Sequence, residues 1–402
     1  SYTQLPAVLS EYISNSYDAD ATEVTIIVDV VDDGRIKTDI TIKDNGIGIA
    51  DEDDDKILGI NNKYLKVGRR RRRADNSSLS KIYKRKLQGK KGIGKLAGFG
   101  ITKKIEISTI SDNILNTFVL DYDDMHEVGA EEEYFPEHTD INKPTDILHG
   151  TSIKLCEIFR KNEIDLSSLV IGLVKRNKIF DDNFKVTLIK NINGLEEVEK
   201  IVIDNEMYLR SIKEVNQTQF EWSIPEKLEE LKLDQNIIKY FNDNHIIGKI
   251  WTSTTPLKKD NQGIILYANG RLCQDNSTFN ERANDNFYQY MYGYLEVDFI
   301  DADIENDNIS TARDSLVWEN PVSQELKSMI DEAIKKIQID WRNLRKNDKK
   351  EKLKKVVDMD IDRWLEELPK SERVTASKLV NTIIEDSSID NDKAKEYIGY
   401  VE

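Results

Sequence analysis

Apolar residues recur with helical spacing over residues 5–18 (LPAVLSEYISNSYD), and Pro6 suits the first turn of a helix. The period then changes to that of strands. Residues 23–31 (EVTIIVDVV) form a β-branched run, and residues 35–42 (RIKTDITI) alternate apolar and polar positions after a turn sequence, DDG. The pattern predicts a helix followed by a β-hairpin, with KDNGIGI at the end of the second strand.

Later segments continue this mixture. Strands are expected at 103–110, 116–122 and 150–158, and a helix at 166–180 with a strand at 184–189 should close the first region. Residues 50–90 are polar and read as a mobile, partly helical insertion. Residues 263–274 and 292–300 are expected as strands of a second α/β unit. From Pro321 onward, a Lys/Glu-rich pattern with helical spacing predicts helices with a charged face.

Composition narrows the class of protein. The 402 residues are 39% hydrophobic and 33% charged, and the apolar runs are too short for a membrane span. No signal peptide is visible, so we expect a cytoplasmic protein, with Cys156 and Cys273 as buried, reduced thiols. Four histidines without paired spacing disfavour a zinc site. The net charge of −16 argues against non-specific nucleic-acid binding by the whole surface.

The first helix carries three polar residues on one face. Glu11 and Asn15 are four residues apart, and Asp18 is three further on. A glutamate in such a place can accept a proton from an attacking water, and an asparagine carbonyl can ligate Mg²⁺. An ordinary amphipathic helix with a polar face explains the same pattern.

The sequence DNGIGI places a carboxylate, Asp44, at the end of a strand, followed by Gly46 and Gly48. The carboxylate could accept a hydrogen bond from an exocyclic amine such as that of adenine. The glycines would let the backbone approach a flat ring. A tight turn after a strand is the alternative interpretation.

The stretch QGKKGIGKLAGFGI, at 88–101, is almost a Walker A loop, but Leu96 stands where Ser or Thr should be. The preceding residues are basic and helix-like, whereas a Walker A loop follows a buried strand. Glycines at the start of a helix direct backbone N–H groups at an anion, and Lys95 adds a positive charge. We interpret the stretch as a lid over phosphates.

These motifs in this order, together with GTSIKL at 150–155, resemble the Bergerat-fold (GHKL) ATPase superfamily. Its members include the ninety-kilodalton heat-shock chaperones, mismatch-repair ATPases, type II topoisomerases, MORC proteins and histidine kinases. The resemblance implies an α+β fold, with a Bergerat α/β sandwich whose mixed sheet has helices on one face. It covers about residues 5–320, and the presence of Glu11 argues against the histidine kinase branch.

The resemblance also implies roles for individual residues. Glu11 would be the general base, Asn15 the Mg²⁺ ligand, and Asp44 the reader of the adenine amine, assisted by Thr151 through water. Asp18 would support the pocket. The remaining residues expected to bind the nucleotide are Gly46 and Gly48 around the base, and Gly92, Ile93, Gly94, Lys95 and Gly98 over the phosphates. The implied ligands are ATP and Mg²⁺.

Three regions are expected: an ATP-binding domain at 1–192 with its lid at about 50–100, a transducer-like α/β domain at 193–320, and a helical extension at 321–402. In the second domain a basic side chain should reach the γ-phosphate. Arg313 in STARDSL is the first candidate, and Lys258 and Lys259 are the second. A structural ion pair of Arg313 with Asp314 or with another acidic residue is the alternative.

The sequence leaves several functions open. The first is a chaperone- or MORC-like ATPase clamp with slow turnover, a homodimer in the ATP state and a protein partner or client. The second is a DNA-engaging subunit of the mismatch-repair or topoisomerase type. Five consecutive arginines, beginning at Arg69 and ending at Arg73, could contact DNA, although the acidic balance disfavours this. The third is a nucleotide sensor in a bacterial anti-phage defence complex.

Overall fold

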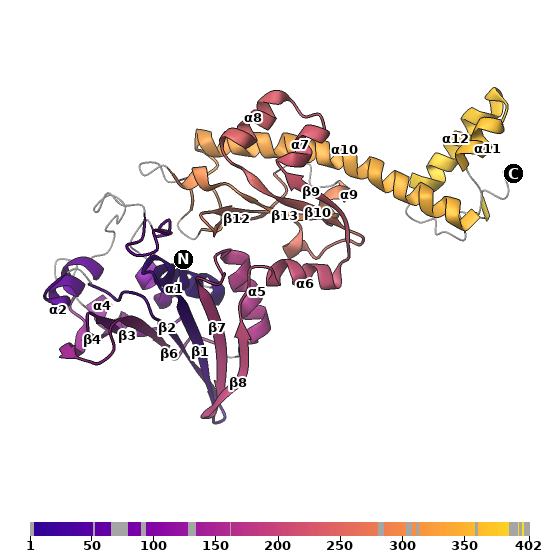
Figure 1. The fold of residues 1–402 in the computed structure, drawn as a ribbon. Coiled ribbons are helices and arrows are strands. Elements are labelled where there is room, and N and C mark those ends of the chain that lie inside the picture. Colours follow the sequence, from indigo (N-terminus) through magenta and orange to yellow (C-terminus); the bar gives the residue numbers. More distant parts are fainter. Residues whose placement is uncertain are drawn as a thin grey trace.

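The computed structural model describes residues 4–50, 53–65, 79–89, 94–127, 134–160, 162–279, 285–302, 308–310, 313–357 and 361–385, and positions 393, 396 and 397. Two β-sheets lie on either side of a layer of helices, and one long helix leads away from them (Figure 1). This confirms the expected α+β class, with a mixed sheet, an α/β second domain and a helical C-terminal part.

The first sheet has eight strands in the order β5-β4-β3-β6-β2-β1-β7-β8. All neighbours are antiparallel except β1 and β7, which run parallel. The strands are β1 (Glu23–Asp32), β2 (Ile36–Asp44), β3 (Lys104–Ser111), β4 (Ile114–Asp121), β5 (Glu137–Pro144), β6 (Gly150–Cys156), β7 (Lys185–Ile192) and β8 (Leu195–Val202).

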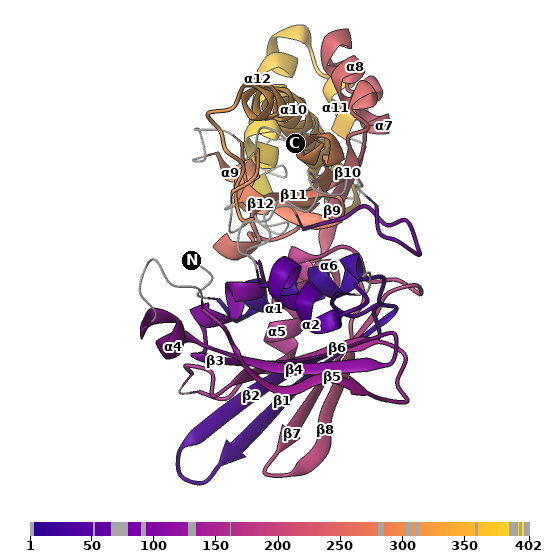
Figure 2. The same cartoon turned by 90° about the vertical axis from the view of Figure 1, so that its left-hand side faces the viewer.

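Helices cover one face of this sheet. Every second residue of β1 from Val24 to Val30 is buried, as the two-residue period of a strand predicts. Against this face pack α1 (Leu5–Asp18) and α5 (Leu166–Arg176), which lie between the first sheet and the second domain (Figure 2). Shorter helices follow at α2 (Lys56–Gly59), η1 (Ile60–Tyr64), η2 (Gly94–Gly100) and α4 (Tyr122–Glu127).

The second sheet has the order β12-β11-β13-β10-β9. Its strands are β9 (Thr218–Ile224), β10 (Ile247–Ser253), β11 (Gly263–Ala268), β12 (Arg271–Ser277) and β13 (Met291–Glu296). Around it lie α6 (Met207–Val215), α7 (Glu226–Glu230), α8 (Gln235–Asp243), η3 (Lys259–Asn261), α9 (Asn286–Tyr290) and η4 (Asp298–Asp301). All six residues of β11 are buried because both faces of the sheet are covered.

The two domains share a hydrophobic interface. Trp251, Tyr267 and Leu272 of the second sheet belong to the same buried cluster as α1, α5 and the first sheet. The Tyr267 hydroxyl also donates a hydrogen bond to the Lys175 carbonyl at 3.0 Å. This apolar interface sets the position of the second domain over the helical layer in the structure.

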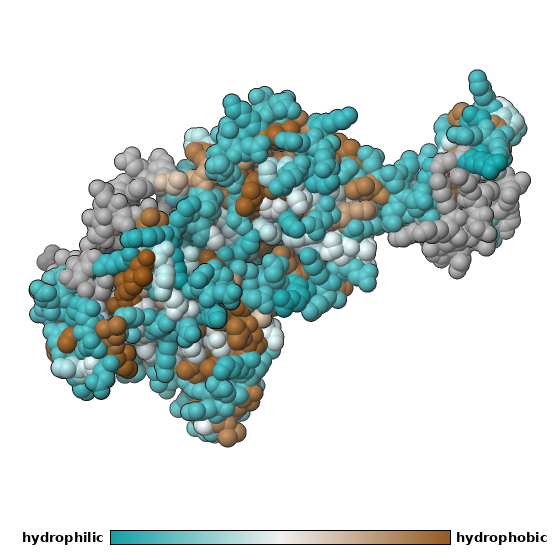
Figure 3. All heavy atoms as spheres, viewed as in Figure 1, coloured by the Kyte–Doolittle hydropathy of each residue, from teal (hydrophilic) through white to brown (hydrophobic). Residues whose placement is uncertain are grey.

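The C-terminal part begins with α10 (Pro321–Val357), whose first turns pack on the second core through Leu326, Ile330 and Ile334. Its later turns leave the body and meet α11 (Ile361–Glu367) and α12 (Lys370–Glu385), as Figure 1 shows. The coloured residues of this projecting part are mostly hydrophilic on the face seen in Figure 3. Within the described residues, none of the helices combines the length and the apolar character needed to cross a membrane.

Some boundaries differ from the sequence-based expectations. The expected helix at 166–180 ends at Arg176, and the first sheet continues past residue 192 because β8 pairs with β7. The stretch 263–274 is a hairpin, not one strand. Its turn residues, Asn269 and Gly270, have φ of 53° and 72°, which suits a two-residue turn. Cys156 and Cys273 are free thiols, but only Cys273 is fully buried.

Candidate nucleotide site

Helix α1 positions the first polar residues of the site. Its apolar side chains, including Leu9 and Ile13, are fully buried against the first sheet, which fixes the rotation of the helix. Glu11 and Asp18 are buried as well, whereas Asn15 is half-buried. The structure therefore places Glu11, Asn15 and Asp18 on one helix, as the sequence predicts, but the three side chains differ in their exposure to solvent.

Asp44 lies at the end of β2, next to α1. Its Oδ2 accepts a hydrogen bond from the Ser16 hydroxyl at 2.8 Å, and its Oδ1 accepts one from the Gly46 backbone N–H at 2.9 Å. Burial raises the pKa of the Asp44 carboxyl, and these bonds and one from the Thr151 backbone lower it in part. Sequence analysis missed Ser16, which lies one residue after Asn15 but packs against a strand distant in sequence.

The backbone around Asp44 has no room for larger residues. A Cβ on Gly46 would lie 2.7 Å from the Ala19 carbonyl oxygen, and one on Gly48, whose φ is +79°, would lie 2.1 Å from the Ile110 carbonyl oxygen. Thr151 is the cross-strand partner of Asp44, and its Oγ1 lies 3.3 Å from that of Thr109. The predicted residues of the base-binding end thus lie together.

The glycine-rich stretch approaches α1 closely. A Cβ on Gly94 would lie 2.6 Å from Glu11 Oε2, and the Gly98 N–H donates to the Tyr12 hydroxyl at 3.1 Å. Gly94 begins η2, a 3₁₀ helix, in agreement with the expected helix start. Gly92 and Ile93 lie outside the described residues, as do the arginines at 69–73.

Lys95 differs from the expectation that it faces phosphates. Its ammonium group donates to the Tyr64 carbonyl and lies 5.3 Å from the centroid of the Tyr64 ring. Tyr64 ends η1, in the first part of the expected lid. Lys95 therefore connects the glycine stretch to this first part of the lid, because a buried ammonium group needs an acceptor and the Tyr64 carbonyl is within its reach.

The end of α1 holds the segment 79–89, which leads into the glycine stretch. Asp18 accepts hydrogen bonds from the backbone N–H groups of Gln88 and Gly89, both at 2.8 Å. Asp20 accepts two more, from Ile82 at 2.8 Å and Tyr83 at 3.1 Å. Asp18 therefore fixes the backbone of residues 88 and 89, which we call the base of the lid. Sequence analysis did not single out Asp20.

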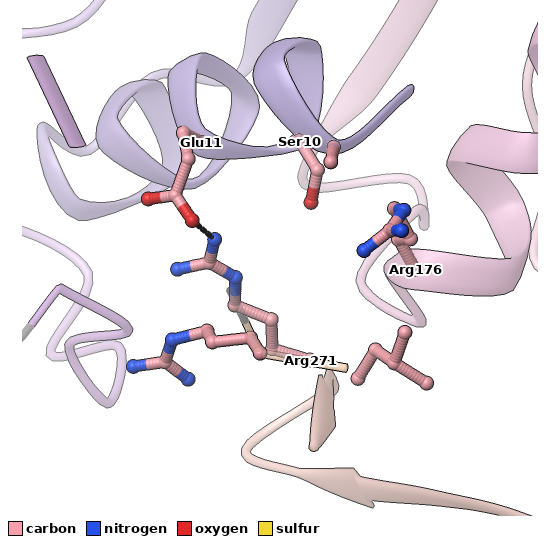
Figure 4. A pocket seen from close by; sticks show the side chains of 7 residues that line it. Ser10, Glu11, Arg176 and Arg271 are labelled. Carbon is pink, nitrogen blue, oxygen red and sulfur yellow. Dashed lines mark hydrogen bonds and ion pairs between the residues drawn. The ribbon is translucent and has the colours of Figure 1, made fainter. Parts of the chain in front are cut away.

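Two arginines of the second domain reach this site. Arg313 donates a hydrogen bond to the Gln88 carbonyl at 2.6 Å, and Arg271, at the start of β12, forms an ion pair with Glu11. Together with Arg176 they line a small, partly open hollow beside α1 (Figure 4). Lys258 and Lys259 lie at the start of η3 and do not line it. Arg271, which pairs with Glu11, is a residue that sequence analysis did not single out.

Residues 2–151 match the family model of the histidine kinase-, DNA gyrase B- and HSP90-like ATPases. The N-terminal domain belongs to this GHKL family. It is an ATP-binding ATPase domain, in agreement with the resemblance found in the motifs.

The whole chain is also 26% identical, over 366 residues, to a protein from Herpetosiphon aurantiacus named "Putative type II restriction enzyme HgiDII". The similarity covers 88% of this chain and 56% of that protein, so the chain spans about half the length of its relative. It extends beyond the GHKL domain, because residues 2–151 alone could not account for it.

The polar residues of this site are compatible with a nucleotide bound together with Mg²⁺. Among the residues that the structure describes, no group of three His, Cys, Asp or Glu side chains could hold a metal ion by itself. Mg²⁺ often keeps waters and binds through one or two protein oxygens plus substrate phosphates. The half-buried Asn15, one turn from Glu11, is suited to be that protein ligand.

Proposed function

We propose that this chain binds ATP with Mg²⁺ at α1, hydrolyses it, and uses the cycle to rearrange its lid and its second domain. The observation that carries the proposal is that one helix contacts every part of the candidate site. Ser16 of α1 contacts Asp44, Asp18 holds the base of the lid, and Glu11 meets Gly94.

The side chains suggest the division of work. Asp44 would accept a hydrogen bond from the adenine amine, because its half-buried carboxyl is already oriented by Ser16 and Gly46. Glu11 would accept the proton of the water that attacks the γ-phosphorus. Asn15 would hold Mg²⁺, which neutralises phosphate charge when bound. Glycine-stretch N–H groups would complete the phosphate site.

Glu11→Ala tests this assignment. We expect it to abolish phosphate release while nucleotide affinity, measured by calorimetric titration, stays within a few-fold of the unchanged protein. Glu196→Ala, an exposed glutamate of β8, is the matched control and should keep full turnover. Turnover that survives in Glu11→Ala would refute the role of Glu11. ATP binding without turnover in the unchanged protein would instead indicate a nucleotide sensor.

The clamp part of the proposal concerns how the site moves the rest of the chain. Arg313 binds the Gln88 carbonyl, so a change in the lid would be transmitted to the second domain. We expect ATP to bring two copies together, and a protein partner or client to be enclosed or released. Light scattering with a non-hydrolysable ATP analogue, compared with ADP, tests this. A mass that doubles with the analogue alone supports the clamp, and an unchanged mass contradicts it.

A second candidate function is DNA engagement. The relative named as a restriction enzyme favours it, and so does the composition of α10. Residues 342–355 contain eight Lys or Arg and two Asp or Glu, in a chain of net charge −16. Arg342 and Arg345 face the second domain, through an ion pair with Asp285 and stacking on Tyr290, so a test of this function replaces other basic residues of the run.

Binding of labelled duplex DNA at several salt concentrations tests this second function. If α10 contacts phosphates, replacing Lys352, Lys354 and Lys355 by Gln should weaken binding and reduce its salt dependence. Replacing Lys37, Lys43 and Lys185 on the first sheet is the control for total charge. Equal loss in both triple variants would indicate a general charge effect. Neutralising the arginines at 69–73 tests the other basic run separately.

A further inference from the structure

The tip of the β11–β12 hairpin enters the GHKL domain. Its two turn residues, Asn269 and Gly270, both have positive φ, which an Asn-Gly pair adopts at little cost. The Lys178 N–H donates to the Gly270 carbonyl at 2.7 Å, and the Gln88 side chain donates to the Asn269 carbonyl at 3.2 Å. These bonds tie the tip to the end of α5 and to the base of the lid.

Residues of the second domain also bind the tip of the hairpin. Asn269 donates its backbone N–H to Asp298 Oδ1 at 2.7 Å and its side-chain amide to Asp301 Oδ2 at 3.1 Å. Arg271, directly after the turn, pairs in an isolated bridge with Asn177, whose side chain accepts a hydrogen bond from Ser10 at 3.0 Å. The position of the Arg271 backbone is therefore set by both domains.

This anchoring places the Arg271 guanidinium on Glu11. The side chains are 4% and 10% exposed, so the pair is screened little by water (Figure 4). Arg271 bonds Oε1 of Glu11, whereas Oε2 faces Gly94, where the glycine stretch begins. The carboxylate is thus held between an arginine of one domain and the phosphate-side backbone of the other.

We propose that Arg271 is the positioning residue of the reaction. It fixes the Glu11 carboxylate so that Oε2 points toward Gly94, and so makes the base competent only while the second domain is seated. This inference rests on the proposed function of Glu11 as the base. A hydrogen-bonded ion pair this deeply buried has a defined geometry, and one fixed oxygen of the carboxylate determines where the other points.

The kinetic test uses Arg271→Gln. We expect kcat to fall about tenfold or more, because a misplaced base loses most of its contribution, while the affinities for ADP and for a non-hydrolysable ATP analogue change less than about threefold. Arg271→Lys should recover part of kcat. A loss of analogue affinity with ADP affinity intact would overturn the proposal, because Arg271 would then act on the γ-phosphate itself.

Two further variants separate positioning from general damage to the interface. Lys178→Gln removes a neighbouring interdomain pair, with Glu296 at 2.5 Å, that does not touch Glu11, and it should keep kcat. Gly270→Ala keeps every charge, but its Cβ would lie 2.6 Å from Ile179 Cγ2 at a positive φ, so the tip must shift. It should reproduce the kcat loss. Equal loss in Lys178→Gln would overturn the proposal.

A thermodynamic cycle tests the contact independently of turnover. Arg271→Gln should lower the thermal unfolding midpoint strongly in the presence of Glu11 and much less in the Glu11→Gln background, because the ion pair between the two side chains is already absent there. If the unchanged protein has no turnover, the proposed function fails but the cycle still reports on the pair. Equal shifts in both backgrounds would show that the pair does not form in solution, and would overturn the proposal.

Discussion

Asp18 and Asp20, at the end of α1, offer a matched pair of perturbations. Both are buried, and each accepts two backbone N–H bonds from the segment 79–89. They differ in what they hold. Asp18 binds Gln88 and Gly89, which lead into the glycine stretch, whereas Asp20 binds residues six positions earlier in the segment. Replacing each by Asn should therefore cost similar stability but have different effects on the nucleotide.

The magnitude follows from the hydrogen bonds. An amide offers one acceptor oxygen where the carboxylate offers two, so each variant loses one charge-assisted bond and points an N–H₂ group at a backbone donor. Such a loss costs about 1.5–3 kcal/mol. For a domain of this size the unfolding midpoint should then fall by about 3–12 °C. Asp20 has φ of 58°, which Asn also adopts, so backbone strain adds little there.

The assay is thermal unfolding with and without an ATP analogue. A ligand that binds the native state raises the unfolding midpoint, so the shift caused by the ATP analogue reports the affinity of each variant for it. We expect this shift to be reduced in Asp18→Asn and retained in Asp20→Asn. The reasoning is refuted if both variants lose the shift equally, or if Asp18→Asn unfolds at the same temperature as the unchanged protein.

Three further predictions concern the base-binding end and the packing behind it. Asp44→Asn should abolish ATP binding in a calorimetric titration yet leave the unfolding midpoint unchanged or raised, because burial disfavours the ionised carboxyl. Since the pKa of Asp44 is raised, ATP binding should weaken at a higher pH, as pH falls, than it would with a carboxyl of ordinary pKa. The effect on folding has the opposite direction: the ionised carboxyl destabilises the fold, and this destabilisation should grow as pH rises through the raised pKa. Gly98→Ala should cost about 1–3 kcal/mol in urea unfolding, because its Cβ would lie 2.6 Å from the Tyr12 hydroxyl.

The local patterns of the sequence predicted much of the first domain. The helix at 5–18, the hairpin after it and the glycine-rich helix start are encoded over short spacings, because period and turn residues act between near neighbours. Asp44, Gly46 and Gly48 belong to one turn, so they could be assigned together. Residues 263–274 were predicted as a single strand, whereas the structure has a hairpin of two strands over 263–277. Its Asn-Gly pair is a local turn signal that could have indicated this.

Contacts between distant segments could not be found in this way. Ser16 meets Asp44 only because α1 crosses the end of β2, and Lys95 reaches the Tyr64 carbonyl only because two parts of the lid meet. The basic residues proposed to reach the γ-phosphate were chosen because the second domain resembles a transducer domain. Of these, Arg313 lies at the lid base through Gln88, while Lys258 and Lys259 lie elsewhere.

The sequence by itself determined the family of the first domain, the ligand class and the polar residues of α1, because these depend on residue type and spacing within one element. Only the tertiary structure decided which arginine meets Glu11. Arg271 and Glu11 are 260 positions apart, and nothing in either local pattern marks the other. Their contact depends on how the second sheet packs on the helical layer, a property of two buried surfaces and not of any motif.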